Sequence, residues 1–98
     1  MSTETADLSA IDAAIHAVDN VKGVSALHAL ERADGGLVIV TRIGLSPALR
    51  LTEVVLTIGE VDYAVRKADS RVQAVFAEPD IAADAGTPTE TIVIRALD

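Results

Sequence analysis

Apolar residues follow a helical period near the start of the chain. Over residues 9–20 the spacing is i, i+3, i+4 and i+7, which places the apolar side chains on one side of a helix: Ile11, Ala14, Ile15 and Val18. Ser9 is the expected N-cap, because its hydroxyl can accept a hydrogen bond from a backbone N–H of the first turn. Residues 20–23 are expected to end this helix.

A period of two follows and predicts a β-hairpin over residues 24–32 and 37–45. Asp34-Gly35-Gly36 lies between the two runs and supplies the positive φ that a tight turn needs. In the second run one face carries Leu37, Ile39, Thr41, Ile43 and Leu45, and the other carries Val38, Val40 and Arg42.

The helical period returns after Ser46-Pro47 and predicts a second helix from a cap at Thr52 to about residue 68. Its apolar stripe comprises Val54, Val55, Ile58, Val61 and Val65. Gly59 weakens this helix by about 1 kcal/mol relative to Ala unless another group packs closely against it.

The remaining pattern predicts two more strands. In the third, over residues 71–77, alternation places Val72, Ala74 and Phe76 on one face. Residues 81–89 contain Gly86 and Pro88 and are expected to form a loop, and residues 91–96 are β-prone enough to form a final strand.

The order α-β-β-α-β, with an additional C-terminal strand, predicts a two-layer α+β domain with both helices on one face of the sheet. We divide the chain into a lead-in at 1–8, the domain at 9–81, and a loop with the last strand at 82–98. The other sheet face keeps apolar residues, so we expect a second copy of the chain to cover it.

Composition and net charge limit the classes of function that the chain could have. The chain has 98 residues, enough for one domain that buries roughly 60–65% of its unfolded surface. It has no cysteine, which excludes disulfides, thiolate nucleophiles and Cys-based zinc sites, and which fits a cytoplasmic location. No run approaches the ~20 apolar residues of a membrane span, so no direct membrane insertion is expected. The net charge of −7 argues against nucleic acid and anionic lipid as partners.

Four segments together resemble the cytoplasmic C-terminal domain of cation diffusion facilitator transporters. They are V-x-G-V at 21–24, Leu27-His28, L-S-P-A-L-R-L-T-E at 45–53 and Ala77-Glu78-Pro79-Asp80-Ile81. The resemblance covers residues 9–81. It implies a ferredoxin-like, metallochaperone-like fold and a homodimer attached to the membrane part of a cation efflux transporter. In many members of that family, zinc or a related divalent ion draws the two copies together and regulates metal transport.

The residues that the resemblance aligns with the family's metal site differ from the family pattern. Its first histidine is kept as His28, and Glu78 keeps the carboxylate, whereas Arg42, Val55 and Phe76 stand where the family has histidines. His28 and Glu78 are the remaining candidate metal ligands. We expect no resident cofactor and at most weak binding of zinc or manganese. At the dimer interface implied by the family we place Arg42, Phe76 and Glu78, with an Arg42–Glu78 ion pair replacing the metal.

The sequence thus predicts a dimerisation and regulatory domain with a largely lost metal site. The alternative is a free-standing ferredoxin-like module that binds a small metabolite at its dimer interface. A small dimeric monooxygenase of the same shape would need a set of polar pocket residues that the sequence does not offer. Because it also lacks paired carboxylates in an apolar setting and any nucleophile motif, we expect no enzymatic activity.

Overall fold

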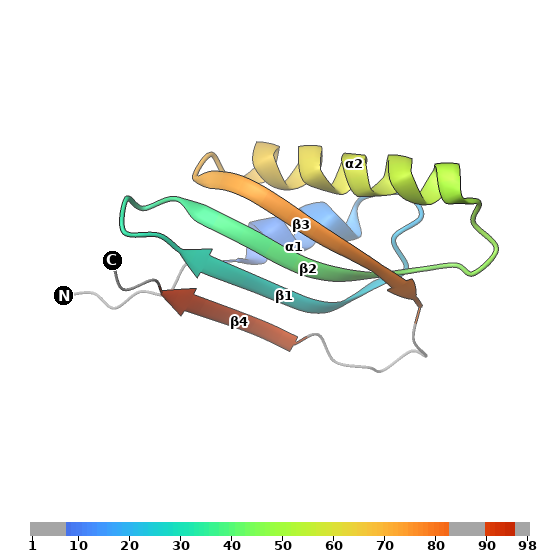
Figure 1. The fold of residues 1–98 in the computed structure, drawn as a ribbon, viewed down its shortest axis with the longest axis horizontal. Helices are drawn as coiled ribbons and strands as arrows, with labels where there is room; N and C mark the ends of the chain where they lie inside the picture. The colour runs from blue at the N-terminus through green and yellow to red at the C-terminus, as the bar shows by residue number, and fades with distance from the viewer. Residues whose placement is uncertain (1–7, 83–89, 96–98) are drawn as a thin grey trace.

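The computed structural model describes residues 8–82 and 90–95 of the chain (Figure 1). The elements follow one another as α1 (Ser9–His16), β1 (Gly23–Glu31), β2 (Leu37–Leu45), α2 (Leu51–Ala68), β3 (Val72–Ile81) and β4 (Glu90–Arg95). The strands form one four-stranded sheet in the order β3-β2-β1-β4. Both helices lie on the same side of it (Figure 1). The predicted two-layer α+β architecture, including the additional C-terminal strand, is confirmed.

The core lies between the helices and one face of the sheet. β2 contributes the predicted inward set, which is buried along its whole length, including Leu37, Ile39 and Ile43 at 0% exposure. α1 adds Ile11 and Ile15, and α2 adds Val61 and Val65, also fully buried. The hydrophobic core is aliphatic. In the ranges that the structure describes, no helix combines the length and the apolar character needed to cross a bilayer.

α1 ends four residues earlier than predicted. The N–H of Val18 donates to the Ile15 carbonyl at 3.1 Å, and Asn20 has a φ of 77°, so the chain turns away from the helix axis. Val18 still packs against the core from this turn. The predicted cap was wrong as well: Leu8 is the N-cap residue, and Ser9 is the first residue of the helix.

α2 begins at Leu51, one residue before the predicted cap at Thr52. The Glu53 carboxylate accepts the backbone N–H of Arg50, the N-cap residue, at 2.7 Å. The predicted apolar stripe was wrong at Val55, whose side chain is 60% exposed. The helix turns by about 100° per residue, so Val55 falls outside the arc that the sheet covers. Thr57 is buried there instead, and its hydroxyl donates to the Glu53 carbonyl at 2.7 Å.

β3 runs four residues beyond its predicted end, through Pro79 to Ile81. It is an edge strand, paired only with β2, and a proline without an N–H is tolerated at such an edge. Placing Ile81 in a loop was therefore wrong. An irregularity in the β2–β3 register turns Val72 toward the core, while Ala74 and Phe76 lie on the other face. The prediction that these three share a face was wrong for this reason.

The hairpin turn is confirmed in its main feature. Gly35 has a φ of 89°, and the Asp34 carboxylate accepts the Gly36 N–H at 2.8 Å. This hydrogen bond lowers the pKa of Asp34. Residues 1–7 of the predicted lead-in and residues 83–89 of the predicted loop lie outside the described residues.

Candidate functional site on the open face of the sheet

The sheet face turned away from the helices is not covered by any described element, and we call it the open face. Antiparallel and parallel pairing align its side chains in rows that cross the strands. One row runs over all four strands through Ile92, His28, Val40 and Phe76. The next row, in the same strand order, comprises Ile94, Leu30, Val38 and Ala74.

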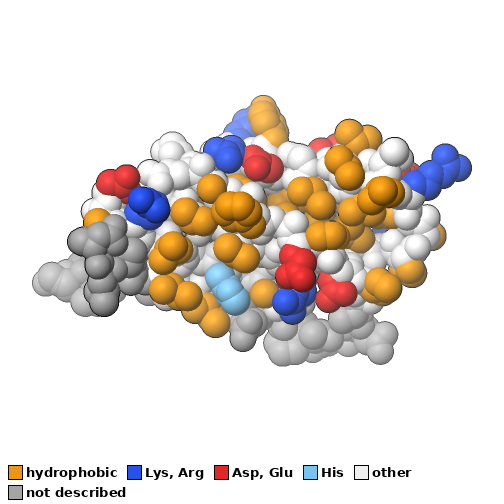
Figure 2. Space-filling view, viewed as in Figure 1, with side chains coloured by type: hydrophobic (Ala, Val, Ile, Leu, Met, Phe, Trp, Pro, Cys, Tyr) orange, Lys and Arg blue, Asp and Glu red, His pale blue; other side chains and the backbone are white. Residues whose placement is uncertain are grey.

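Most of the open face is apolar and accessible to water. Phe76 is 60% exposed, Ile94 53%, Val40 43% and Ile92 38%. Hydrophobic side chains spread across the strands in Figure 2, with a histidine and a few charged groups among them. A contiguous apolar surface of this extent marks an interaction site more often than a surface left in water.

The charged groups of the open face include an ion pair. Arg42 of β2 and Glu78 of β3 are register partners, and the Arg42 Nε donates to the Glu78 Oε1 at 3.3 Å. Their side chains are 48% and 64% exposed. Ala26 completes this third row on β1. The ion pair expected at these positions therefore forms within a single chain.

The structure brings together four of the five positions that the resemblance aligns with the family's metal site. His28, Arg42, Phe76 and Glu78 lie on the open face of three neighbouring strands. Val55 does not join them, because it projects from α2.

These side chains do not suit a zinc ion. His28 offers one imidazole and Glu78 one carboxylate, whereas a structural zinc site needs four donors. The Glu78 carboxylate already accepts from Arg42, and the guanidinium would repel a divalent cation. Across the described parts of the chain, no three His, Cys, Asp or Glu residues gather in a way that could hold a metal ion.

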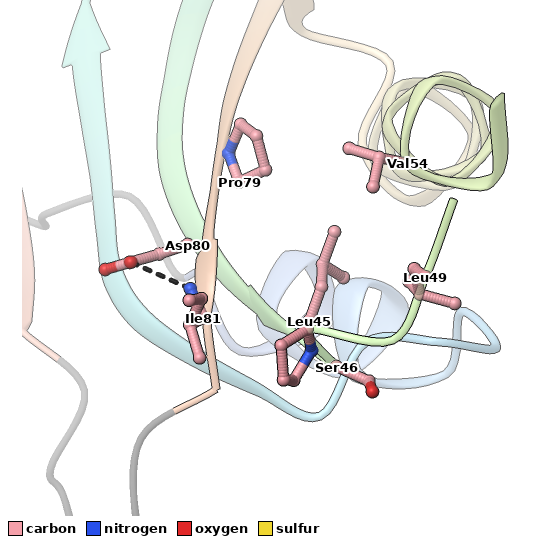
Figure 3. A pocket seen from close by; sticks show the side chains of 8 residues that line it. Leu45, Ser46, Leu49, Val54, Pro79, Asp80 and Ile81 are labelled. Atoms are coloured by element: carbon pink, nitrogen blue, oxygen red, sulfur yellow. Dashed lines mark hydrogen bonds between the residues drawn. The ribbon is translucent and has the colours of Figure 1, made fainter. Parts of the chain in front are cut away.

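Two shallow grooves border this region. One, of about 450 Å³, is lined by Val40, Ile58, Val75, Phe76, Ala77 and Glu78. The other, of about 410 Å³, lies between α2, the loop before it and the end of β3 (Figure 3). Its Asp80 carboxylate accepts the N–H of Ile81 at 2.8 Å. Each groove holds a single carboxylate that is already hydrogen-bonded. Neither groove therefore offers a convergent set of polar groups of the kind that fixes a small metabolite.

Sequence reasoning missed a second exposed apolar surface, on the side of α2 turned away from the sheet. Leu51, Val55, Leu56 and Tyr63 are each at least 60% exposed. The available signal was the number of apolar residues in this helix, which exceeds what one buried stripe requires.

No protein-family model matches the sequence, and no curated protein matches it. Solved structures do match. A manganese form of a variant MamM C-terminal domain has a TM-score of 0.74 and 21% identity over 84% of this chain and 88% of that one. A copper form of the MamM C-terminal domain has a TM-score of 0.71 and 22% identity over 93% and 90%. MamM C-terminal domains are cation diffusion facilitator domains. The chain therefore has the ferredoxin-like, metallochaperone-like fold of a cation diffusion facilitator C-terminal domain, as its sequence resemblance predicts.

Proposed function

We propose that this chain is a homodimeric regulatory domain of the cation diffusion facilitator type, in which the open faces of two copies close on each other. The observation that carries the proposal is the pair of apolar rows on a sheet face that no described element covers. The domain acts by association on the cytoplasmic side of a membrane, and the membrane part of a cation transporter is its further partner. Its response to metal is weak or absent.

The size of the open face supports a specific dimer. Three strands of nine or ten residues are about 30 Å long, β4 with six residues is about 20 Å long, and the four side by side are about 19 Å wide. The face therefore offers on the order of 500 Å², a large part of the ~800 Å² that each partner buries in a standard interface. Burying Phe76 and Val40 supplies the main gain, at about 25 cal/mol for each Å² of apolar surface removed from water.

The Arg42–Glu78 pair fits such an interface. Each charge is already matched within its own chain, so closing a second copy over the face does not bury an isolated charge. Without the pair, the same closure would bury either a lone guanidinium or a lone carboxylate, which costs several kcal/mol. The pair thus allows a metal-independent interface at the place where the family uses coordination.

The direct test is sedimentation velocity of the unmodified chain and of Phe76→Asp. We expect the unmodified chain to form a dimer and Phe76→Asp to be monomeric, because the substitution replaces the largest apolar side chain of its row with a charge. Ile81→Asp is the matched control: Ile81 is similarly exposed, at 65%, but lies at the end of β3 in the groove of Figure 3. A dimer that survives Phe76→Asp would refute the open-face interface.

A further inference from the structure

α2 is apolar on two opposite sides. Its inner side packs against the core through Val61 and Val65, and its outer side exposes large apolar residues: Leu51 at 77%, Val55 at 60%, Leu56 at 67% and Tyr63 at 68%. α2 runs along one margin of the molecule, and no other described element lies beyond it (Figure 1). Large exposed apolar residues gathered on one surface mark an interaction site more often than a surface left in water.

The outer residues form a ridge with a gap at its centre. Leu51, Val55, Gly59, Tyr63 and Lys67 follow one another at intervals of four, the spacing that lines side chains up along a helix. A Cβ at Gly59 would meet nothing within 4 Å, so no group among the described residues uses the space that the glycine leaves. Glycine in the middle of an exposed helix lowers helix stability, and its usual structural benefit is close approach of another backbone.

We propose that α2 forms a second interface between copies of this chain, packing antiparallel against α2 of another copy with Gly59 facing Gly59. In this arrangement Val55 of each copy lies beside Tyr63 of the other, and Leu56 fills the adjacent side. The surface is distinct from the open face, so the inference goes beyond the proposed function.

The charges on α2 favour a second copy of this chain as the partner and an antiparallel arrangement of the two helices. α2 has Glu53 in its first turn and Arg66 and Lys67 in its last. Positions equidistant from Gly59 meet in the antiparallel pair, which brings Lys67 of one copy level with Leu51 and close to Glu53 of the other. A parallel pair would instead place like charges and like helix-dipole ends together. Arg66 is engaged by Asp62 and by the Gln73 carbonyl, which leaves Lys67, lying over Tyr63, as the cation for this contact.

The interface is small. One pair of five-turn helices buries less than the ~1,600 Å² of a standard interface, so the association is weak and concentration-dependent. Two different twofold contacts on one chain produce tetramers or longer assemblies. A chain that uses both surfaces therefore grows beyond a dimer as its concentration rises.

Sedimentation equilibrium from about 10 µM to about 1 mM tests the proposal on the unmodified chain, Gly59→Gln and Leu56→Glu. Gly59→Gln should keep or raise the melting temperature, because glutamine is the better helix former, while weakening the α2 association at least tenfold. Leu56→Glu should weaken it similarly. Ala10→Gln, a polar substitution at an exposed position of α1, is the control and should leave association unchanged.

This experiment distinguishes the α2 interface from the open-face interface. Loss of association in Gly59→Gln but not in Phe76→Asp supports the α2 contact and contradicts the open-face dimer. If Gly59→Gln and Leu56→Glu both associate like the unmodified chain, or if the unmodified chain never exceeds a dimer that Phe76→Asp abolishes, the α2 proposal is overturned.

Discussion

Arg42 on β2 and Glu78 on β3 are neighbours across parallel strands, with 3.3 Å between the Arg42 Nε and the Glu78 Oε1, on an otherwise largely apolar sheet face. The two residues stand at positions where the resembled family has a histidine and a carboxylate for metal. In the proposed dimer, charge pairing at these positions takes the place of metal coordination. The replacement removes two requirements of a zinc site: a free carboxylate and a region without positive charge.

Breaking this pair should weaken the dimer through the charge that remains. Arg42→Ala leaves Glu78 unpaired in the interface, so we expect the dimer dissociation constant to rise about tenfold or more. The exchanged variant, Arg42→Glu with Glu78→Arg, restores an ion pair and should return the constant to within about threefold of the original. Analytical ultracentrifugation measures both constants. If Arg42→Ala dimerises as well as the unmodified chain, the pair lies outside the interface.

Restoring histidines should restore metal binding. Arg42→His together with Phe76→His removes the repelling guanidinium and gives three imidazoles and the Glu78 carboxylate on neighbouring strands, a plausible ligand set for zinc. We expect calorimetry to show zinc binding that the unmodified chain lacks or shows only weakly. The control, Arg32→His with Ile81→His, adds two histidines away from these positions and should bind no more zinc than the unmodified chain. Equal uptake by the two variants would contradict the assigned positions.

The buried hydroxyl of Thr41 should contribute to stability. Its Oγ1 donates to the Ala26 carbonyl at 2.7 Å, where the β1–β2 register shifts, and the residue is 1% exposed. Thr41→Val keeps the shape but leaves that carbonyl without this donor, so the free energy of unfolding should fall by about 1–2 kcal/mol. Thr52→Val, at an exposed position, should change it by less than about 0.5 kcal/mol. Urea denaturation followed by circular dichroism gives both values, and equal effects would contradict this role.

The turn between α2 and β3 should make stability depend on acid. The Asp69 carboxylate accepts two hydrogen bonds from the Arg71 guanidinium, at 3.0 and 2.7 Å, and these lower the pKa of Asp69. A carboxyl whose pKa is lower in the folded than in the unfolded state stabilises the fold above the unfolded pKa, about 3.9. This stabilisation is lost as the pH falls through the lower, folded value.

Asp69→Asn should remove that contribution at neutral pH, about 1 kcal/mol, and flatten the loss of stability between roughly pH 5 and pH 2. Melting temperatures across this range measure the effect. Asp19→Asn, at an exposed carboxyl on the turn after α1, is the control and should follow the unmodified chain. An unchanged acid profile in Asp69→Asn would contradict the assignment.

Most of the fold could be predicted from the sequence, because the helices and strands follow from the spacing of apolar residues. The inward set of β2 alternates without exception, and the glycine turn before it fixes the hairpin, so this part was predicted residue by residue. The ends of the helices and strands were harder to predict from the sequence. β3 continues through Pro79 because it is an edge strand, which is a property of the sheet and not of the local sequence.

The open face was predicted only in part. Alternation in β2 placed Val40 and Arg42 opposite the core, but Phe76 was grouped with Val72 because a register irregularity cannot be read from alternation. The contribution of Ile92 and Ile94 depends on β4 pairing with β1, a contact between distant segments. Val55 was misassigned because two apolar faces overlap in the sequence of α2, and the sequence does not say which one the sheet covers.

The most direct test of the central claim is sedimentation equilibrium of the unmodified chain with and without zinc, at concentrations low enough to isolate the first association step. We predict a dimer whose dissociation constant is the same in both conditions, because apolar packing holds the open faces together and each charge is already matched within its own chain. A chain that stays monomeric up to about 100 µM, or a dimer that zinc tightens tenfold or more, would contradict it.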